Sequence, residues 1–124
     1  MMTFGFFHLH VNDLAAMSAW YRDIVGMTQN FDSKKFKGFV TENGFFFNMS
    51  ERTDLQNGTY PSGINGTMNI GFNVPTHKDV ETEYERLIIG GAKALTPPKV
   101  WGKFCDAYLA DPEGNIIIIT AVDE

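Results

Sequence analysis

Two histidines separated by a single residue, His8 and His10, are the side chains of this sequence best suited to chemistry. On a strand they would point to the same face, because side chains two residues apart do so. A neutral imidazole can bind a divalent metal ion or act as a general base near neutral pH. A catalytic metal site needs at least a third donor. The sequence offers four candidates elsewhere: Glu42, Glu51, His77 and Asp106. The alternative is that both histidines only line a cavity or face solvent.

Other catalytic arrangements find less support. Cys105 is the only cysteine, which excludes an internal disulfide and is typical of a reducing compartment. No partner base for its thiol is identifiable, so we expect a buried thiol and no cysteine catalysis. The sequence also lacks a nucleophile-elbow motif, so we do not expect a serine hydrolase.

Aromatic side chains are abundant, at 14% of the residues. Each of them singly is more typical of a core, but as a set they can also wall a cavity for a planar ligand. Trp101 is the best single candidate for ligand contact, because it lies on a glycine-rich approach to a strand. The candidates for such walls are Phe6, Phe45, Phe47, Trp101, Phe104 and Tyr108.

These side chains need elements to position them, and the periodicity of the first half predicts one helix and four strands. Alternation over 4–11 predicts a strand, and apolar residues at helical spacing from Leu14 to Val25 predict a helix. Asn12 or Asp13 can cap that helix and Gly26 can end it. Three further strands are expected over about 27–33, 36–41 and 45–49, with a hairpin at Asn43-Gly44.

The second half repeats this order. A strand over about 68–74 carries Asn69, Gly71 and Asn73 on one face, where they either line a cavity or face water. A helix follows, capped by Thr76 with Asp79 and stopped by Gly90-Gly91. Three strands are expected over 93–96, 104–110 and 115–121, with turns at Pro97-Pro98 and 111–114.

The repeat has a constant offset. Val74 follows Val11, and Tyr84 follows Tyr21, by the same 63 residues. We therefore expect an α+β fold of two βαβββ modules in one domain of residues 1–124. Module one covers about residues 1–56, a linker about 57–66, and module two about 67–124.

The composition argues against two classes of binding partner, nucleic acids and membranes. The formal net charge is −5 and basic residues do not cluster, so we do not expect nucleic acid as a partner. The N-terminus lacks the basic start and apolar core of a signal peptide, and no apolar stretch approaches the roughly 20 residues of a membrane span. We expect a cytoplasmic protein that does not enter a membrane.

Two groups of motifs resemble the vicinal oxygen chelate superfamily of glyoxalases, bleomycin resistance proteins and dioxygenases. The first runs from Val11-Asn12-Asp13-Leu14 through Trp20-Tyr21 to Val25-Gly26-Met27, and the second joins Trp101-Gly102 to the turn at 111–115. The resemblance covers essentially the whole chain. It implies an open, cup-like mixed sheet of two βαβββ modules, the glyoxalase/bleomycin-resistance fold, and a homodimer with a ligand held inside the cup.

The resemblance also places the metal ligands of this superfamily on the first and last strand of each module. The corresponding positions in this sequence are Phe6, Asn69, Ile118 and, depending on strand register, Phe47 or Asn48. Phenylalanine and isoleucine have no donor atom, and the asparagine amide is a weak neutral ligand. The superfamily's metal site is therefore predicted to be absent, and no cofactor is expected.

The leading hypothesis is a small-molecule-binding protein without a metal, one that sequesters a planar or aromatic compound. Bleomycin resistance proteins carry a similar Trp-Gly pair and bind a planar cationic drug, which favours the same function for this chain. The predicted ligand-binding residues are Phe6, His8, His10, Asn48, Asn69, Trp101, Tyr108 and Ile118. One alternative is a glyoxalase-like lyase or isomerase whose divalent metal sits at a relocated site that includes His8 and His10. The other is a metal-free enzyme in which one of these histidines is the catalytic general base.

Overall fold

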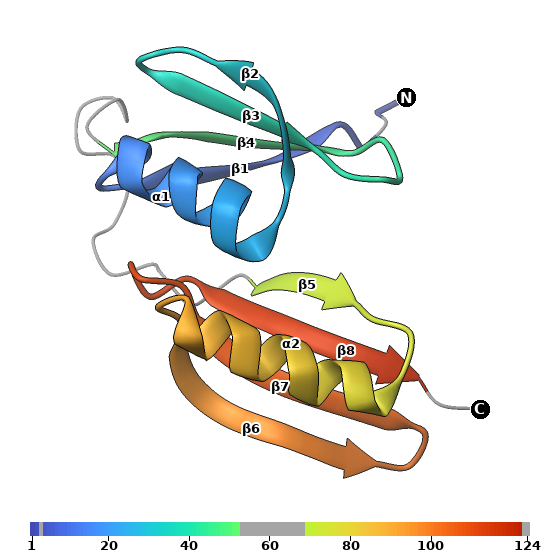
Figure 1. The fold of residues 1–124 in the computed structure, drawn as a ribbon. Coiled ribbons are helices and arrows are strands. Elements are labelled where there is room, and N and C mark those ends of the chain that lie inside the picture. The colour runs from blue at the N-terminus through green and yellow to red at the C-terminus, as the bar shows by residue number, and fades with distance from the viewer. Residues whose placement is uncertain (3, 53–68, 123–124) are drawn as a thin grey trace. The chain divides into compact units, whose positions relative to one another are not determined.

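The computed structural model describes residues 1–2, 4–52 and 69–122, and the chain divides into two units, Met1–Pro61 and Ser62–Glu124. Both units contain a strand, a helix and three further strands in that order (Figure 1). The α+β fold with two βαβββ modules is therefore confirmed. The predicted linker, residues 57–66, lies outside the described residues.

The first unit is a four-stranded mixed sheet with one helix. Its strands lie in the order β1-β4-β3-β2; β1 is parallel to β4 and the other neighbours are antiparallel. The helix α1 continues directly into a π-helical segment, η1. The elements are β1 (Phe6–Val11), α1 (Leu14–Trp20), η1 (Tyr21–Val25), β2 (Thr28–Asp32), β3 (Phe36–Val40) and β4 (Phe46–Glu51).

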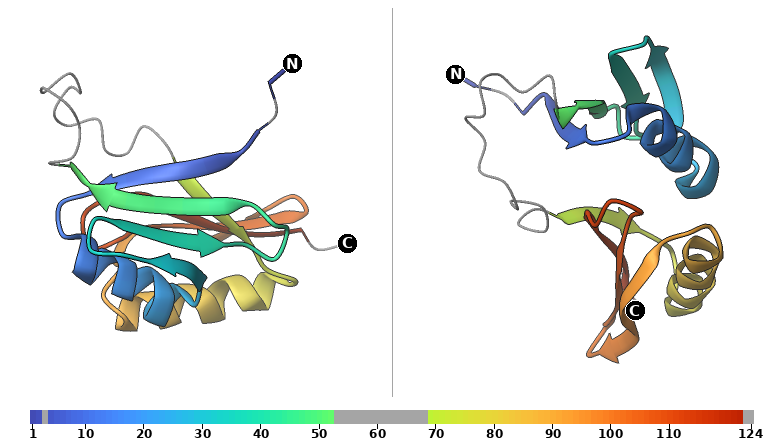
Figure 2. Two further views of the ribbon diagram at one scale, coloured as in Figure 1. Left: turned by 90° about the horizontal axis from the view of Figure 1, so that it is seen from above. Right: turned by 90° about the vertical axis from the view of Figure 1, so that its left-hand side faces the viewer.

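The second unit has the same topology, with strand order β5-β8-β7-β6 and a parallel pair formed by β5 and β8. In each unit the helix covers one face of the sheet only (Figure 2). The elements are β5 (Asn69–Asn73), α2 (His77–Ile89), β6 (Lys93–Trp101), β7 (Phe104–Ala110) and β8 (Ile116–Val122).

The helix-covered face of each sheet forms that unit's core. In the first unit Tyr21 packs on Phe47 with ring centroids 5.4 Å apart, and both side chains are buried. In the second unit Val80 and Leu87 of α2 are buried above alternate residues of β7 and β8. Cys105 belongs to this core, so the predicted buried thiol is confirmed. Because side chains alternate along a strand, the intervening residues lie on the face opposite the helix.

The predicted helix caps are confirmed. The Asp13 carboxylate accepts a hydrogen bond from the backbone N–H of Ala16, and Gly26 ends the helical segment with φ 92°. Thr76 and Asp79 form a reciprocal capping box at the start of α2. These contacts satisfy backbone groups that the helix itself leaves unpaired, which explains why both helices begin where the sequence predicts.

The predicted turn at Pro97-Pro98 is wrong. The strand β6 continues through both prolines to Trp101, and its pairing with β7 shifts in register between Thr96 and Lys99. Proline cannot donate to a sheet ladder, but β6 is an edge strand, where such residues are tolerated. The chain instead reverses after Trp101, at Gly102 with φ 60°. Trp101 is therefore the last residue of a strand and not part of its approach.

The turn between β7 and β8 is organised by one buried carboxylate. Asp111 is fully buried and accepts hydrogen bonds of 2.9 Å from the backbone N–H of Glu113, the backbone N–H of Asn115 and the Asn115 side-chain amide. The predicted structural role of this turn is confirmed. The three bonds hold the start of β8, whose side chains form much of the second core.

Asp111→Ala is expected to lower the free energy of unfolding by about 3 kcal/mol, because it leaves two buried donors and one partly buried donor without an acceptor. Urea denaturation followed by circular dichroism measures this change. Glu81→Ala, an exposed change on α2, is the control and is expected to cost less than about 0.5 kcal/mol. Equal effects of the two substitutions would contradict the assigned role of Asp111.

Candidate functional site

Strand register decides which side chains of the first sheet face away from α1. In the parallel pair His8 lies beside Asn48 and His10 beside Ser50. Phe47 is only 4% exposed and contacts both Tyr21 and Phe39, so it belongs to the helix-covered face. Of the two positions left open by the sequence, Asn48 is therefore the one that shares a face with Phe6, His8 and His10. We call this face of the first unit the histidine face.

Ser50 joins the two histidines on the histidine face. Its Oγ atom lies 2.7 Å from His8 Nε2 and 3.2 Å from His10 Nδ1, both within hydrogen-bond distance. The two imidazole rings stack with centroids 4.5 Å apart and planes inclined by 27°. Phe36 of β3 meets His8 edge-on at 5.8 Å. Sequence reasoning missed Ser50, although its spacing of two residues from Asn48 would have identified it once that register was known.

The environment of His8 disfavours a positive charge. Burial of part of the ring lowers the pKa of His8 below its usual 6.5, and the nearby His10 lowers it further. His8 is therefore neutral near pH 7. A neutral imidazole keeps one nitrogen lone pair, which can accept a proton or a hydrogen bond.

A glycine makes room for polar side chains beside the histidines. Gly38 of β3 pairs with Asn48 of β4, and a Cβ atom built on Gly38 would lie 2.8 Å from Asn30 Oδ1 and 3.2 Å from Phe31 Cβ. Any larger residue would displace these two β2 residues. The histidine face thus combines amide, hydroxyl and imidazole groups with aromatic rings.

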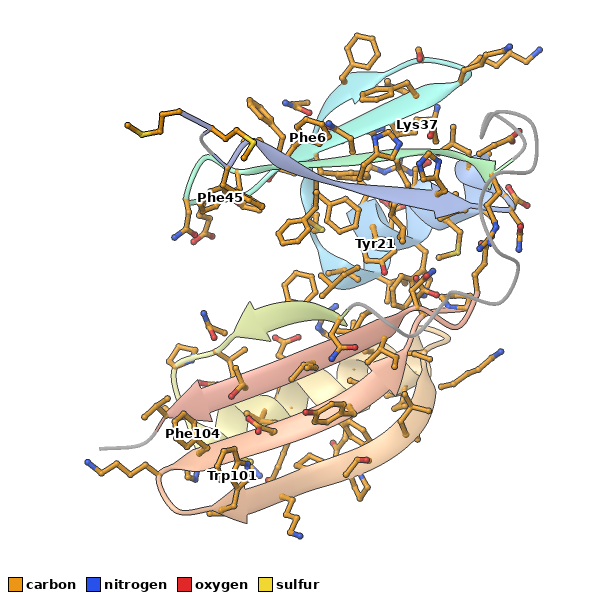
Figure 3. The ribbon with its side chains drawn as sticks, turned by 180° about the vertical axis from the view of Figure 1, so that it is seen from behind. Phe6, Tyr21, Lys37, Phe45, Trp101 and Phe104 are labelled. Atoms are coloured by element: carbon orange, nitrogen blue, oxygen red, sulfur yellow. The ribbon has the colours of Figure 1, made fainter. Side chains whose placement is uncertain are left out.

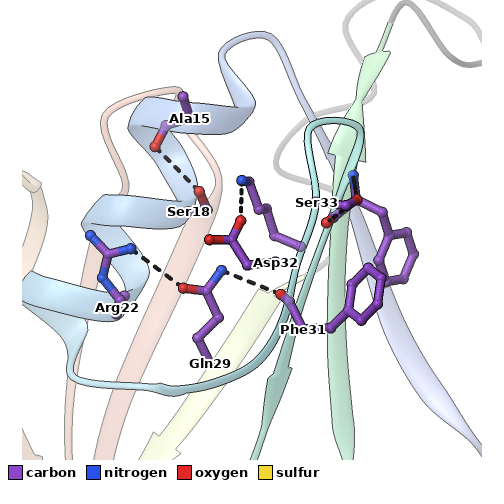
Figure 4. Close-up of polar contacts among 9 residues, drawn as sticks. Ala15, Ser18, Arg22, Gln29, Phe31, Asp32 and Ser33 are labelled. Carbon is purple, nitrogen blue, oxygen red and sulfur yellow. Dashed lines mark hydrogen bonds and ion pairs between the residues drawn. The ribbon is translucent and has the colours of Figure 1, made fainter.

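Contacts along β2 hold Gln29, Phe31 and Asp32 in place (Figure 4). The Arg22 guanidinium donates to Gln29 Oε1 at 3.4 Å, and Gln29 Nε2 donates to the carbonyl oxygen of Phe31 at 3.3 Å. Lys37 forms an ion pair with Asp32 at the end of the strand. These bonds tie β2 to the helical segment and to β3, so the edge strand can present its side chains in one arrangement.

In the second unit, the face opposite α2 carries an exposed aromatic pair. Trp101 and Phe104 stack with centroids 4.8 Å apart and planes inclined by 22°, and they lie together at the hairpin between β6 and β7 (Figure 3). Trp101 Nε1 donates to Asp106 Oδ2 at 2.9 Å, and the Thr120 hydroxyl donates to Asp106 Oδ1. Trp101 is 54% exposed although its ring orientation is constrained. We call Trp101, Phe104 and Asp106 the tryptophan platform.

The remaining predicted residues lie on the same face of the second sheet. Asn69 on β5 is exposed, Tyr108 on β7 is partly exposed, and Ile118 on β8 lies between them in the strand order. Gly71 pairs with Ile118, and no atom of the described residues would lie within 4 Å of a Cβ built on it. The predicted site residues thus lie on two sheet faces, one in each unit. The face in the first unit carries Phe6, His8, His10 and Asn48. The face in the second unit carries Asn69, Trp101, Tyr108 and Ile118.

Neither face offers a complete metal site. The superfamily resemblance places metal ligands at four positions, which are Phe6, Asn48, Asn69 and Ile118. The side chains of Phe6 and Ile118 have no donor atom. Within residues 1–2, 4–52 and 69–122, no three His, Cys, Asp or Glu side chains come together in a way that could hold a metal ion. The residues present therefore do not fit the superfamily's metal.

The proposed third donors to His8 and His10 are engaged elsewhere or lie on other surfaces. Glu51 pairs with Val11, on the helix side of the first sheet, and Glu42 lies in the exposed turn after β3. In the second unit, Asp106 is held by Trp101 and Thr120, and His77 Nε2 bonds to the carbonyl oxygen of Lys103 at 2.9 Å. No described helix combines the length and apolarity that a membrane crossing requires.

Comparison with known proteins identifies the family. The model of the Glyoxalase/Bleomycin resistance protein/Dioxygenase superfamily matches residues 3–119. The chain belongs to this superfamily. A search of curated proteins found no match.

Several solved structures share the fold of this chain. A glyoxalase-related enzyme from Fulvimarina pelagi is 25% identical with a TM-score of 0.85, covering 98% of this chain and 88% of its own. The fosfomycin resistance protein FosX from Listeria monocytogenes is 23% identical with a TM-score of 0.72, covering 98% and 91%. A lactoylglutathione lyase from Agrobacterium tumefaciens is 19% identical with a TM-score of 0.73, covering 98% and 94%.

The lowered pKa of His8 predicts a pH-dependent stability. The unfolded chain binds a proton at this imidazole more readily than the folded chain, so the free energy of unfolding falls as the pH drops below 6.5. His8→Gln removes this contribution. The loss of stability between about pH 7.5 and about pH 5.5 should therefore be smaller in the variant than in the wild type.

Urea denaturation at the two pH values measures the difference. Asn48→Ala changes the same face without altering a titratable group, so it is expected to keep the wild-type pH dependence. An identical pH dependence in His8→Gln and the wild type would contradict the assigned environment of His8.

Proposed function

We propose that this superfamily member binds a small planar organic molecule, without a metal ion, through the tryptophan platform. The observation that carries the proposal is the stacked pair of Trp101 and Phe104, which remains exposed while Asp106 constrains the indole. An exposed aromatic face attracts planar apolar ligands. Because the ring is already oriented, little conformational entropy would be lost on binding.

The negative charge of Asp106 and of the whole chain bears on the charge of the ligand. Asp106 accepts hydrogen bonds from Trp101 and Thr120 beside the aromatic pair, and the whole chain has a formal net charge of −5. A cation near an aromatic ring and a carboxylate is stabilised by both. We therefore expect planar cations to bind more tightly than planar anions of similar size.

The available donor atoms favour metal-free binding over metal-dependent chemistry. FosX is described as a complex with Mn(II) and sulfate, whereas this chain carries phenylalanine, isoleucine and two asparagines at the positions where the superfamily resemblance places metal ligands. A glyoxalase-like lyase or isomerase would need donors that the described residues do not assemble. Sequestering a toxic planar compound is the simplest role for such a protein. The proposal includes a homodimer, because each sheet has edge strands that a second copy can cover.

Trp101→Ala is expected to weaken binding of proflavine, a planar cationic dye, by about tenfold or more, because stacking on one aromatic side chain contributes roughly 1–3 kcal/mol. Fluorescence anisotropy of the dye at fixed ionic strength measures the affinity. Val100→Ala is the matched control. Val100 is similarly exposed on β6, and its side chain lies on the opposite face of that strand.

Two outcomes would contradict the proposal: no saturable binding of proflavine to the wild-type protein, or equal affinity in the Trp101→Ala and Val100→Ala variants. An anionic dye, anilinonaphthalenesulfonate, tests the role of charge. Weaker binding of this dye than of proflavine, with the difference reduced in Asp106→Asn, is the expected result.

A further inference from the structure

We propose that His8, Ser50 and His10 form a proton relay through which His8 removes a proton from a small molecule bound at the histidine face. This is a catalytic site in the first unit, and it shares no residue with the tryptophan platform. It therefore does not depend on the proposed function, and its test can fail or succeed independently.

The geometry of Ser50 is the main argument. Its Oγ atom lies 2.7 Å from His8 Nε2 and 3.2 Å from His10 Nδ1. A hydroxyl has one hydrogen to donate and lone pairs to accept with, so it donates to one imidazole and accepts from the other. Ser50 is only 7% exposed, which limits competition from solvent for these two bonds. The two histidines, which lie on one edge strand, are thus connected through a mostly buried hydroxyl.

One arrangement of hydrogens allows a complete proton transfer. His8 Nε2–H donates to Ser50 Oγ, and the Ser50 hydroxyl donates to His10 Nδ1. His8 Nδ1 then carries a lone pair, and it makes no hydrogen bond to any residue in the described part of the chain. This nitrogen is the position at which a ligand's proton can arrive.

The transfer conserves protons and charge. A proton leaves the ligand for His8 Nδ1, the Nε2 proton passes to Ser50 Oγ, and the hydroxyl proton passes to His10 Nδ1. The ligand keeps the electron pair of the broken bond, and His10 becomes an imidazolium. Return of the proton at another ligand atom completes an isomerisation that needs no oxidant, reductant or metal ion.

The residues around His8 suit its proposed role as the base. Burial lowers the pKa of His8, so a proton taken there is passed on more readily than it is kept. Among the positions of β1, β4 and β3 that share the histidine face, only His8 and His10 are titratable. The others are Phe6, Phe36, Gly38, Val40, Phe46, Asn48 and Ser50. No carboxylate at these positions competes for the proton.

The same side chains indicate the class of ligand. Phe36 lies against His8, and Phe31 meets Phe36 at 5.7 Å, so aromatic rings border the base. Asn48 lies beside His8 in the strand pairing and carries an amide that can bond a ligand oxygen or nitrogen. A planar molecule with an acidic C–H group next to a hydrogen-bond acceptor fits this combination.

Nitrobenzisoxazole is the test probe, used with the full chain. It is a planar heterocycle from which a base removes one carbon-bound proton; the N–O bond then breaks and a coloured cyanonitrophenolate forms. His8→Gln is expected to lower kcat/KM by about a hundredfold, the usual contribution of a general base. Ser50→Ala is expected to lower kcat by about tenfold with KM little changed, because His8 keeps its place but loses the relay.

Two further variants separate a relay from a structural effect. Ser50→Thr keeps the hydroxyl and is expected to retain most of the activity that Ser50→Ala loses. A threonine suits this position of the fold, because Thr120 occupies the corresponding position of the second unit, beside Asn73 in the parallel pair. His77→Gln, on α2, is expected to leave the rate unchanged. Wild-type turnover that does not depend on His8, or is absent, would overturn the proposal. So would a Ser50→Ala rate equal to that of the wild type.

A measurement on the unmodified protein covers the case in which a variant fails to fold. Nitrogen-15 NMR of the imidazoles reports which ring nitrogen carries the hydrogen. The relay requires neutral His8 and neutral His10 both to be protonated at Nε2. A hydrogen on His10 Nδ1, or on His8 Nδ1 in place of Nε2, would overturn the proposal.

Discussion

The parallel pairing of the first and last strand in each unit determines which side chains the protein can present. Because strand side chains alternate, one register places Phe47 and Met49 under α1 and leaves Asn48 and Ser50 on the opposite face. A shift of one residue would bury the polar side chains and expose the aromatic core. The buried contact between Tyr21 and Phe47 therefore stabilises the register on which both the core and the histidine face depend.

The two units use equivalent strand positions for different chemistry. Ser50 lies beside His10 in the first unit, and Thr120 lies beside Asn73 in the second. The hydroxyl of Ser50 bonds two imidazoles, whereas that of Thr120 bonds the carboxylate that holds Trp101. In the first unit the fold orients a pair of imidazoles, and in the second it orients an exposed aromatic pair.

Buried polar side chains of the described residues find hydrogen-bond partners within the protein. Within the described part of the chain, no buried side-chain nitrogen or oxygen lacks a hydrogen-bond partner. Asp106 accepts from Trp101 and Thr120, and Ser50 is matched by two histidines. Side chains that already satisfy one another are pre-organised, so little ordering would be needed for the ligand binding and proton transfer that we propose.

The sequence by itself determined the elements and the family. Periodicity and the caps at Asp13 and Thr76 predicted the elements, because these signals depend on neighbours a few residues apart. The repeat offset of 63 residues, which can be read directly along the chain, predicted that the elements form two βαβββ modules. The same reasoning ended a strand at Thr96, because a proline pair usually marks a turn and the edge position of β6 was not visible.

Only the tertiary structure decided which residues meet. Strand register determines that Asn48, and not Phe47, lies on the histidine face. It also determines the contact of Ser50 with histidines 40 and 42 residues away. The hydrogen bond between Trp101 and Asp106 depends on register in the same way. Register is set by the packing of whole strands against a helix, and local sequence does not specify it. The sequence could therefore name His8, His10 and Trp101 as candidates, but not the serine and the aspartate that orient them.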